Sequence, residues 1–422
     1  MFMPVSAPPT GTVKRPPPIP RPAPVERAAS PLIASLGPRP DAAGFWRSLP
    51  GGSTPVIEAD PAGSADHAVV TFLWRGSAAT RAVLVLPNKV ADPRALERNL
   101  MDRVPGTDIW HWSVRMRRDW RATYTLCVDE GQGTAGLEGA EHAAWLRGQG
   151  RRDPLNPRSF PPRWGGEPVS VVELPGAPAQ SDWLPRPGVP AGTVSTHTFA
   201  SRVLGNERRV RAYAPPGEDH RDLPVLVLFD GEMWQPGLGV ATLLDNLIAD
   251  GRIPPLVALL PESLGSDARW AELTCNDGFV DFLADELLPW AAGRWPLTAD
   301  PARTVLAGQS LGGLMAAHAA VRAPHRFGNA LAQSGSFWWP NGPDAEWLTH
   351  AIATTEAARL PVRFHLSAGE QEWVLLPANR RLRDALQAHG HDIHYREFNG
   401  GHDYLCWRTE LADGLVHLLG QH

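Results

Sequence analysis

Residues 305–313, with the sequence VLAGQSLGG, constrain the fold more than any other stretch of the chain. A short apolar segment ends at Gly308, and Ser310 follows two positions later. Gly312 and Gly313 then lead into an Ala/Leu/Met-rich segment with helical period. A G-x-S-x-G pattern between a strand and a helix is typical of a nucleophile elbow, where a strained turn lifts the serine hydroxyl above the sheet. Glycines flank the serine because a Cβ there would collide with the neighbouring strand or helix. The pattern predicts Ser310 as the covalent nucleophile of a hydrolase or acyl-transfer enzyme. The competing interpretation is an ordinary glycine turn.

A nucleophilic serine needs a base and an acid that orients the base, and in this fold class the chain order is Ser, acid, His. The strand-like residues 362–369 end in a glycine, and Glu370 and Glu372 follow in the next loop. His402 lies on a glycine-containing loop after the strand-like residues 394–398. A histidine at this place can reach a serine at the same sheet edge, so His402 is the predicted base.

Three histidines near the end of a predicted helix, His389, His391 and His394, raise the possibility of a metal site. No carboxylate or cysteine lies at ligand spacing from them, so a solvated loop is the favoured interpretation and no metal site is predicted.

The composition bounds the class of protein. A length of 422 residues favours two domains, and a net charge of −5 argues against a nucleic-acid-binding protein. Cys127, Cys275 and Cys406 are few, odd in number and far apart, which favours reduced thiols in a cytoplasmic protein. No apolar run reaches 18 residues and the N-terminus has no signal-peptide pattern, so neither a membrane span nor secretion is predicted.

The chain divides into four predicted parts. Residues 1–40 are rich in proline and are predicted to be a disordered tail. Residues 41–160 contain several short, alternating strand-like segments, which favour a β-sandwich of immunoglobulin-like type. Residues 161–191 are rich in Pro and Gly and are the predicted linker. Residues 192–422 alternate strands and helices, which predicts an α/β domain with a parallel sheet and a site at the carboxyl ends of its strands.

Acyl transfer also needs N–H donors for the oxyanion. The backbone amide of Leu311 follows the nucleophile, and the second donor is expected in the loop after an early strand. The backbone amide of Glu232, beside Gly231, occupies that place.

Several stretches in order carry a resemblance to a known family. In the second half of the chain they are residues 228–234 (LFDGEMW), 269–273 (RWAEL), 308–313 (GQSLGG), 333–340 (QSGSFWWP) and 400–408 (GGHDYLCWR). In the first half they are residues 71–76, 105–110 and 153–157. Together they resemble the enterochelin (enterobactin) esterases over nearly the whole chain after residue 40. The proline-rich residues 1–40 are not part of the family's pattern.

The resemblance implies a two-domain cytoplasmic serine esterase of α/β-hydrolase fold, of the esterase D-like type. Such an enzyme opens the ester bonds of a ferric tris-catecholate trilactone, so iron enters only with the substrate and no cofactor is expected. The family carries its acid three residues after the glycine that ends the acid strand, which implies Glu372. Glu370 is the second candidate and Asp403, next to the base, is the third.

A ferric tris-catecholate is a bulky aromatic trianion, and a site for it should combine cations with aromatic faces. Loops at the predicted strand ends supply such residues, and we expect substrate binding by the following set: Arg269, Trp234, Trp270, Trp338 and Trp339. The alternative for Arg269 is a surface pair with Glu272, three residues further along a helix.

Two other functions remain open at this point. A general carboxylesterase or feruloyl-type hydrolase would share Ser310 and His402 and differ in its pocket. A non-catalytic siderophore-binding protein would use the sandwich as its binding module, but it has no need of Ser310, Glu372 and His402 together.

Overall fold

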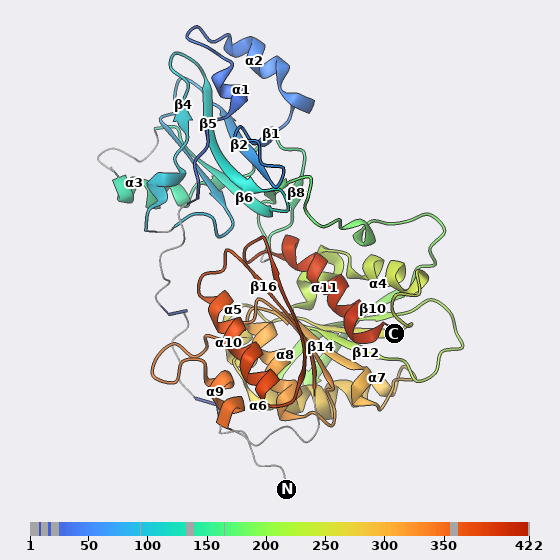
Figure 1. Ribbon diagram of the computed structural model, residues 1–422. Helices are drawn as coiled ribbons and strands as arrows, with labels where there is room; N and C mark the ends of the chain where they lie inside the picture. The colour runs from blue at the N-terminus through green and yellow to red at the C-terminus, as the bar shows by residue number, and fades with distance from the viewer. Residues whose placement is uncertain are drawn as a thin grey trace. The chain divides into compact units, whose positions relative to one another are not determined.

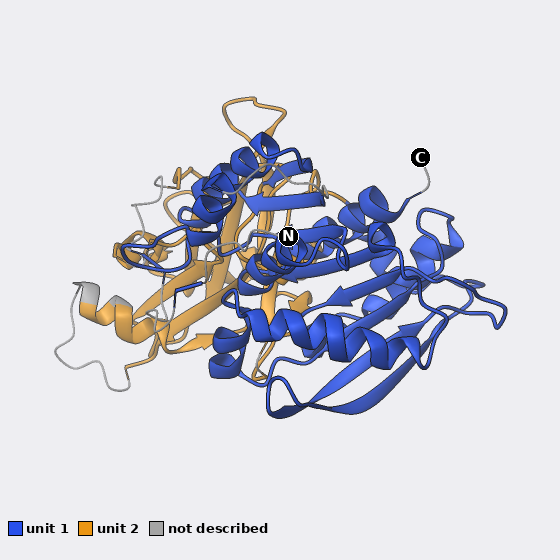
Figure 2. Ribbon diagram, turned by 90° about the horizontal axis from the view of Figure 1, so that it is seen from below, with its two compact units in different colours: residues 1–20, 179–398, 407–422 blue, residues 21–178, 399–406 orange. Residues whose placement is uncertain are grey.

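The computed structural model describes residues 8–9, 16–17, 25–92, 94–131, 139–163, 165–354 and 362–420. They divide into two compact units, which Figure 2 shows in different colours. Unit 1 comprises residues 1–20, 179–398 and 407–422, and unit 2 comprises residues 21–178 and 399–406. The short segment 399–406 is therefore part of unit 2, although the residues on both sides of it belong to unit 1.

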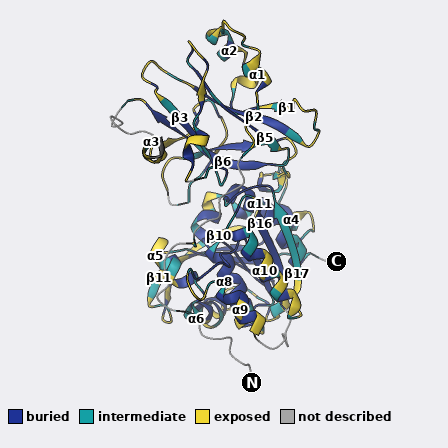
Figure 3. Cartoon of the chain, turned by 60° about the vertical axis from the view of Figure 1, so that its left-hand side comes forward, coloured by how far each residue is buried: buried dark blue, intermediate teal, exposed yellow. Residues whose placement is uncertain are grey.

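Unit 1 is built on an eight-stranded sheet of order β10-β11-β13-β12-β14-β15-β16-β17. The first three strands pair antiparallel and the strands from β13 to β17 run parallel. Central strands such as β12, with the sequence VLVL, are fully buried, as expected where helices cover both faces of a parallel sheet. The edge strand β17 is mostly intermediate in burial and is teal in Figure 3. The strands are β10 (Thr193–Ser201), β11 (Asn206–Ala214), β12 (Val225–Leu228), β13 (Val257–Pro261), β14 (Thr304–Gln309), β15 (Asn329–Gln333), β16 (Arg363–Gly369) and β17 (Asp392–Phe398).

Helices pack on both faces of this sheet (Figure 1). Val225 and Val227 share a large core cluster with residues of α6 to α10, whereas Leu331 and His365 point to the opposite face, where they meet Gly414 of α11. The α-helices are α4 (Val240–Ala249), α5 (Ser266–Leu273), α6 (Asp277–Asp281), α7 (Leu288–Ala292), α8 (Leu311–Arg322), α9 (Trp347–Thr354), α10 (Leu375–Ala388) and α11 (Tyr404–Leu419), with short turns η3 (Ser181–Trp183), η4 (Met233–Gly237), η5 (Phe282–Leu287) and η6 (Pro301–Arg303). Alternating strands and helices around a mainly parallel sheet make unit 1 α/β-hydrolase-like, as predicted.

Unit 2 contains two antiparallel sheets, of order β1-β2-β5-β4 and β3-β6-β9-β8, with β7 paired to β6. Phe72 and Trp112 of the first sheet share one hydrophobic cluster with Val85 and Tyr124 of the second. The strands are β1 (Val56–Ala59), β2 (His67–Arg75), β3 (Ala82–Pro87), β4 (Asp102–Arg103), β5 (Ile109–Arg117), β6 (Arg121–Asp129), β7 (Gly150–Arg151), β8 (Ser159–Phe160) and β9 (Val169–Glu173); the helices and turns are α1 (Pro31–Ala34), α2 (Ala42–Ser48), η1 (Pro50–Gly52), η2 (Leu96–Asn99) and α3 (Gly139–Arg147).

Residues 25–40 differ from the predicted disordered tail, most of whose other residues lie outside the described part of the chain. Arg27 bridges to Val114 of β5 and pairs with Asp102 at 2.6 Å. Ser30 caps α1 and donates from its hydroxyl to Glu58 at 2.6 Å. These contacts hold residues 25–40 against the first sheet, whereas their proline content predicted disorder.

Candidate active site

The turn between β14 and α8 has the geometry of a nucleophile elbow. Ser310 has φ 59° and ψ −119°, a strained conformation for a residue with a side chain. A Cβ on Gly308 would lie 2.4 Å from the carbonyl carbon of Gly312, so only glycine fits at that position. The Ser310 amide donates to the carbonyl of Gln333 at 3.0 Å, and its carbonyl accepts from the amide of Ser336 at 2.9 Å. The backbone therefore holds Ser310 from both sides while its side chain stays partly exposed.

The side chain of Ser310 contacts a second serine. Its Oγ lies 3.2 Å from the Oγ of Ser336, which sits in the loop after the neighbouring strand β15. Gly335, just before Ser336, has no room for a side chain, because a Cβ there would lie 2.3 Å from the ring of Phe337. The Ser336 hydroxyl was not among the predicted site residues, and the repeated Gly-Ser pattern after β15 is the signal that could have indicated it.

The predicted acid lies at the same edge of the sheet as the nucleophile. The parallel register pairs Gln333 at the end of β15 with Gln309 of β14 and with Ser367 of β16. The loop after β16 carries Glu372, which is completely buried and accepts from the amide of Gly369 at 2.8 Å.

The other two acid candidates have different surroundings. Glu370 is exposed, and its amide donates to Phe398 of β17. Asp403 is buried, but both of its carboxylate oxygens accept backbone or side-chain hydrogen bonds from Thr123 and Leu405. Glu372 is therefore the buried candidate within unit 1. His402 belongs to unit 2 by residue contacts, so its pairing with Ser310 stays a prediction.

The predicted oxyanion donors lie at two helix starts. Leu311 is the first residue of α8, and an N–H in the first turn has no carbonyl one turn earlier to which it can donate. Glu232 follows Gly231, where a Cβ would lie 2.3 Å from the carbonyl oxygen of Leu260, so the tight approach of this turn to β13 requires glycine.

The side chain of Glu232 points to a different partner. Its carboxylate accepts from the amide of Ser263 at 3.0 Å and from the Ser263 hydroxyl. Burial and the nearby charge of Asp230 raise the pKa of Glu232, although the Ser263 donors and its own amide lower it. The oxyanion roles of the Leu311 and Glu232 amides stay predictions.

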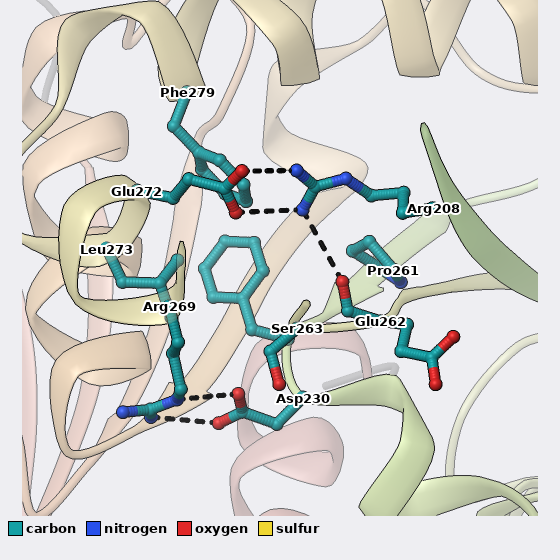
Figure 4. Close-up of a pocket in the computed structure, with 10 residues that line it drawn as sticks. Arg208, Asp230, Pro261, Glu262, Ser263, Arg269, Glu272, Leu273 and Phe279 are labelled. Carbon is teal, nitrogen blue, oxygen red and sulfur yellow. Dashed lines mark hydrogen bonds and ion pairs between the residues drawn. The ribbon is translucent and has the colours of Figure 1, made fainter. Parts of the chain in front are cut away.

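Arg269 forms a buried ion pair, and the substrate contact predicted for it stays a prediction. It is 7% exposed, and its guanidinium holds Asp230 through two bonds of 2.7 and 2.9 Å. The same group donates to the carbonyl of Gln309, the residue before the nucleophile, at 3.1 Å. Glu272, the alternative partner considered for Arg269, pairs with Arg208. Figure 4 shows the two ion pairs side by side around a small pocket. Arg269 thus ties the turn that carries Glu232 to the end of the elbow strand.

The four predicted tryptophans differ in accessibility. Trp234 is fully buried and donates from its indole nitrogen to Gln309 at 3.2 Å, and Trp339 is 1% exposed. Trp338 is 6% exposed, and only Trp270 is half-buried; their ring centroids lie 6.4 Å apart. Trp234 and Trp339 are core residues here, since a ring without an exposed face cannot stack on a ligand. Trp270 is partly accessible and lies beside Trp338.

The described residues contain no group of three His, Cys, Asp or Glu side chains arranged to hold a metal ion, His389, His391 and His394 included. A membrane crossing needs a long apolar helix, and the described part of the chain has none.

An elbow serine with a buried glutamate at the same edge of a mainly parallel sheet defines unit 1 as an α/β-hydrolase. Comparison with known proteins narrows the class. Residues 69–183 match the enterochelin esterase N-terminal family and residues 201–418 match the putative esterase family. The iron(III) enterobactin esterase of Dickeya dadantii is 34% identical over 92% of this chain and 96% of its own. The chain therefore belongs to the enterochelin esterase family.

Solved structures agree with this assignment. The ferric enterobactin esterase of Salmonella typhimurium matches with a TM-score of 0.76 and 32% identity over 89% of this chain and 98% of its own. The enterobactin esterase of Shigella flexneri, crystallised in the presence of enterobactin, matches with a TM-score of 0.75 and 31% identity over 89% of this chain and 97% of its own.

Proposed function

We propose that this esterase hydrolyses the trilactone ester bonds of a ferric tris-catecholate siderophore of the enterobactin type, so that iron can be released. The observation that carries the proposal is the elbow at Ser310, in a chain that matches iron(III) enterobactin esterases along nearly its whole length. Iron enters with the substrate, and the reaction itself needs no cofactor.

In the proposed mechanism Ser310 Oγ attacks the ester carbonyl as His402 takes its proton, and Glu372 orients the histidine. The amides of Leu311 and Glu232 stabilise the oxyanion of the tetrahedral intermediate. The intermediate collapses to an acyl-enzyme when the alcohol of the neighbouring seryl unit leaves with the proton from His402. Water, deprotonated by the same histidine, then releases the acid and restores Ser310.

For substrate recognition we propose Trp270, supported by Trp338, as the stacking partner of one catecholate ring. An offset or edge-on contact between aromatic rings suits a flat catechol, and Trp270 is the half-buried member of the four predicted tryptophans.

Two broader expectations belong to the same proposal. The two antiparallel sheets of unit 2 share one core cluster, which supports an immunoglobulin-like β-sandwich. Cys127, Cys275 and Cys406 are all buried as thiols and not as disulfides, which supports a location where thiols stay reduced, such as the cytoplasm.

The test is a product analysis by chromatography. The protein is incubated with the ferric trilactone, and linear trimer, dimer and monomer are followed over time beside the Ser310→Ala variant. We expect wild-type protein to form these products and the variant to form almost none. Equal product from the variant would refute the nucleophile. Turnover of simple aryl esters alone would favour the general or feruloyl-type esterase. No product from any ester would favour a binding protein.

A further inference from the structure

Residues 399–406 join β17 to α11 and carry His402, yet their contacts make them part of unit 2 (Figure 2). In an α/β-hydrolase the base follows the acid in the chain and must reach the nucleophile on the sheet. The hydrogen bonds of residues 399–406 lead to Asn88, Asp119 and Thr123 in the first half of the chain, 280 to 314 residues away in sequence.

Two of these bonds hold the backbone on either side of Gly401. Asn399 donates from its side-chain nitrogen to Asp119 at 2.7 Å. Asn88 donates from its side-chain nitrogen to the carbonyl oxygen of His402 at 3.0 Å. The second bond acts on the peptide group of the predicted base itself.

The residue after the base is anchored more strongly. The Oδ2 atom of Asp403 accepts from both the amide and the hydroxyl of Thr123, each at 2.7 Å, while Oδ1 accepts from the amide of Leu405 at 3.0 Å. Asp403 is 5% exposed. Hydrogen bonds to an ionised acceptor are the short, strong class, and a buried carboxylate depends on them. Burial raises the pKa of Asp403, and the Thr123 donors oppose that rise.

Close packing fixes the remaining position. A Cβ on Gly401 would lie 2.7 Å from the side-chain oxygen of Asn88 and 2.8 Å from the Cβ of Lys89. The loop therefore has its backbone against the turn after β3, and positions 399, 401, 402 and 403 are all restrained by unit 2.

We propose that Thr123 and Asn88 are positioning residues for His402. This inference rests on the proposed function, in which His402 is the base. General-base catalysis depends on the base lying within hydrogen-bond reach of the serine, and a displacement of about 1 Å can cost about 100-fold in rate. Both residues act through the loop and touch no reacting atom.

Thr123→Val is the direct test, because it removes the hydroxyl donor and keeps the branched shape and the backbone amide. Thr123→Ser keeps the donor. Thr125→Val is the matched control, since Thr125 lies two residues further along β6 on the same face and is half-buried like Thr123. A neutral p-nitrophenyl ester serves as substrate, so that siderophore binding does not enter the readout.

We expect Thr123→Val to lower kcat by about ten-fold or more with KM nearly unchanged, and to slow inactivation of Ser310 by a fluorophosphonate to the same extent. Thr123→Ser and Thr125→Val should stay near wild type, and Asn88→Ala should behave like Thr123→Val. Melting temperatures show whether the threonine variants are equally folded. If Thr123→Val folds poorly, the kcat of Asn88→Ala tests the same positioning role.

The outcomes separate this proposal from the one on which it rests. If kcat of Thr123→Val and Asn88→Ala equals that of the Thr125→Val control while Ser310→Ala is inactive, the positioning roles are wrong and the hydrolase stands. If aryl esters are cleaved and the ferric trilactone is not, the substrate assignment fails and the expected pattern of kcat still supports the positioning roles. Wild-type activity in Ser310→Ala would overturn both.

Discussion

Replacing Arg269 by methionine tests whether the buried ion pair behind the elbow is structural. Arg269 and Asp230 have side chains 8% and 0% exposed, joined by two hydrogen bonds. Removing one partner of a buried pair leaves an uncompensated charge, which costs about 3–5 kcal/mol. Arg269→Met should therefore lower the free energy of unfolding by about this amount, as measured by urea unfolding followed through tryptophan fluorescence.

The matched control is Arg209, which forms a two-bond pair of the same type with Glu262 at 2.6 and 2.7 Å. The side chain of Arg209 is 58% exposed and that of Glu262 is 15% exposed, so this pair is open to water, whereas the pair of Arg269 and Asp230 is not. Arg209→Met should cost less than about 1 kcal/mol. The double variant Asp230→Asn/Arg269→Met should be more stable than Arg269→Met alone, because it leaves no buried charge; asparagine tolerates the φ of +59° at position 230.

The activity of Arg269→Met separates a structural role from a substrate contact. Loss of the bond to the Gln309 carbonyl should lower kcat on a neutral aryl ester by about ten-fold or more, because the strand end before Ser310 is no longer held. The reasoning is refuted if stability changes no more than in Arg209→Met. It is also refuted if kcat on the neutral ester is unchanged while KM rises for the ferric trilactone alone, the pattern of a direct contact with the trianion.

Three further outcomes follow from single positions. Gly231→Ala should lower the free energy of unfolding by about 3 kcal/mol in the same urea assay, because its Cβ would lie 2.3 Å from a backbone oxygen of β13. Gly251→Ala should lower it by about 1 kcal/mol, because Gly251 has φ +65° but open space around it. Burial lowers the pKa of His365 from 6.5 to about 3, so its neutral form stabilises the fold above pH 6.5 and this stability is lost as pH falls toward 3. Between pH 7 and pH 5 the free energy of unfolding of the wild type should fall by about 2 kcal/mol more than that of His365→Leu. An equal fall in both proteins would contradict this. Glu372→Gln should lower kcat by about 100-fold or more and Glu370→Gln should leave it unchanged, and the reverse order would exchange the two assignments.

The local sequence was sufficient to predict the strand, turn and helix that carry Ser310. The glycines and the serine of residues 308–313 have few other uses between a strand and a helix, and the structure has a strand end, a residue at φ 59° and a helix start there. The apolar sequences of β12 and β13 agree with the predicted parallel sheet, because a buried parallel strand must be apolar on both faces.

Accessibility could not be predicted in this way, because it depends on what packs against a side chain from distant parts of the chain. Loop position suggested an exposed ligand site for Trp234, yet its ring stacks on Trp183 at 5.9 Å and is fully buried. An i, i+3 spacing suggested that Arg269 pairs with Glu272, but Asp230, from another loop, is its partner. The bond between Thr123 and Asp403 spans 280 residues, and neither residue carries a local signal for it.

Gln309, between Gly308 and Ser310, is a polar residue in the buried part of the elbow motif. Gln309 is completely buried, where an apolar side chain would ordinarily be favoured. It accepts from the Trp234 indole at 3.2 Å and donates to the Gln333 side chain at 2.8 Å; Gln333 in turn donates to the carbonyl of Trp407 at 2.7 Å. Each amide accepts from one side and donates to the other, so the network fixes how β14, β15 and α11 lie against each other below the nucleophile. Ser310 is thus the predicted nucleophile of the elbow, and Gln309 beside it stabilises the strand end that carries Ser310.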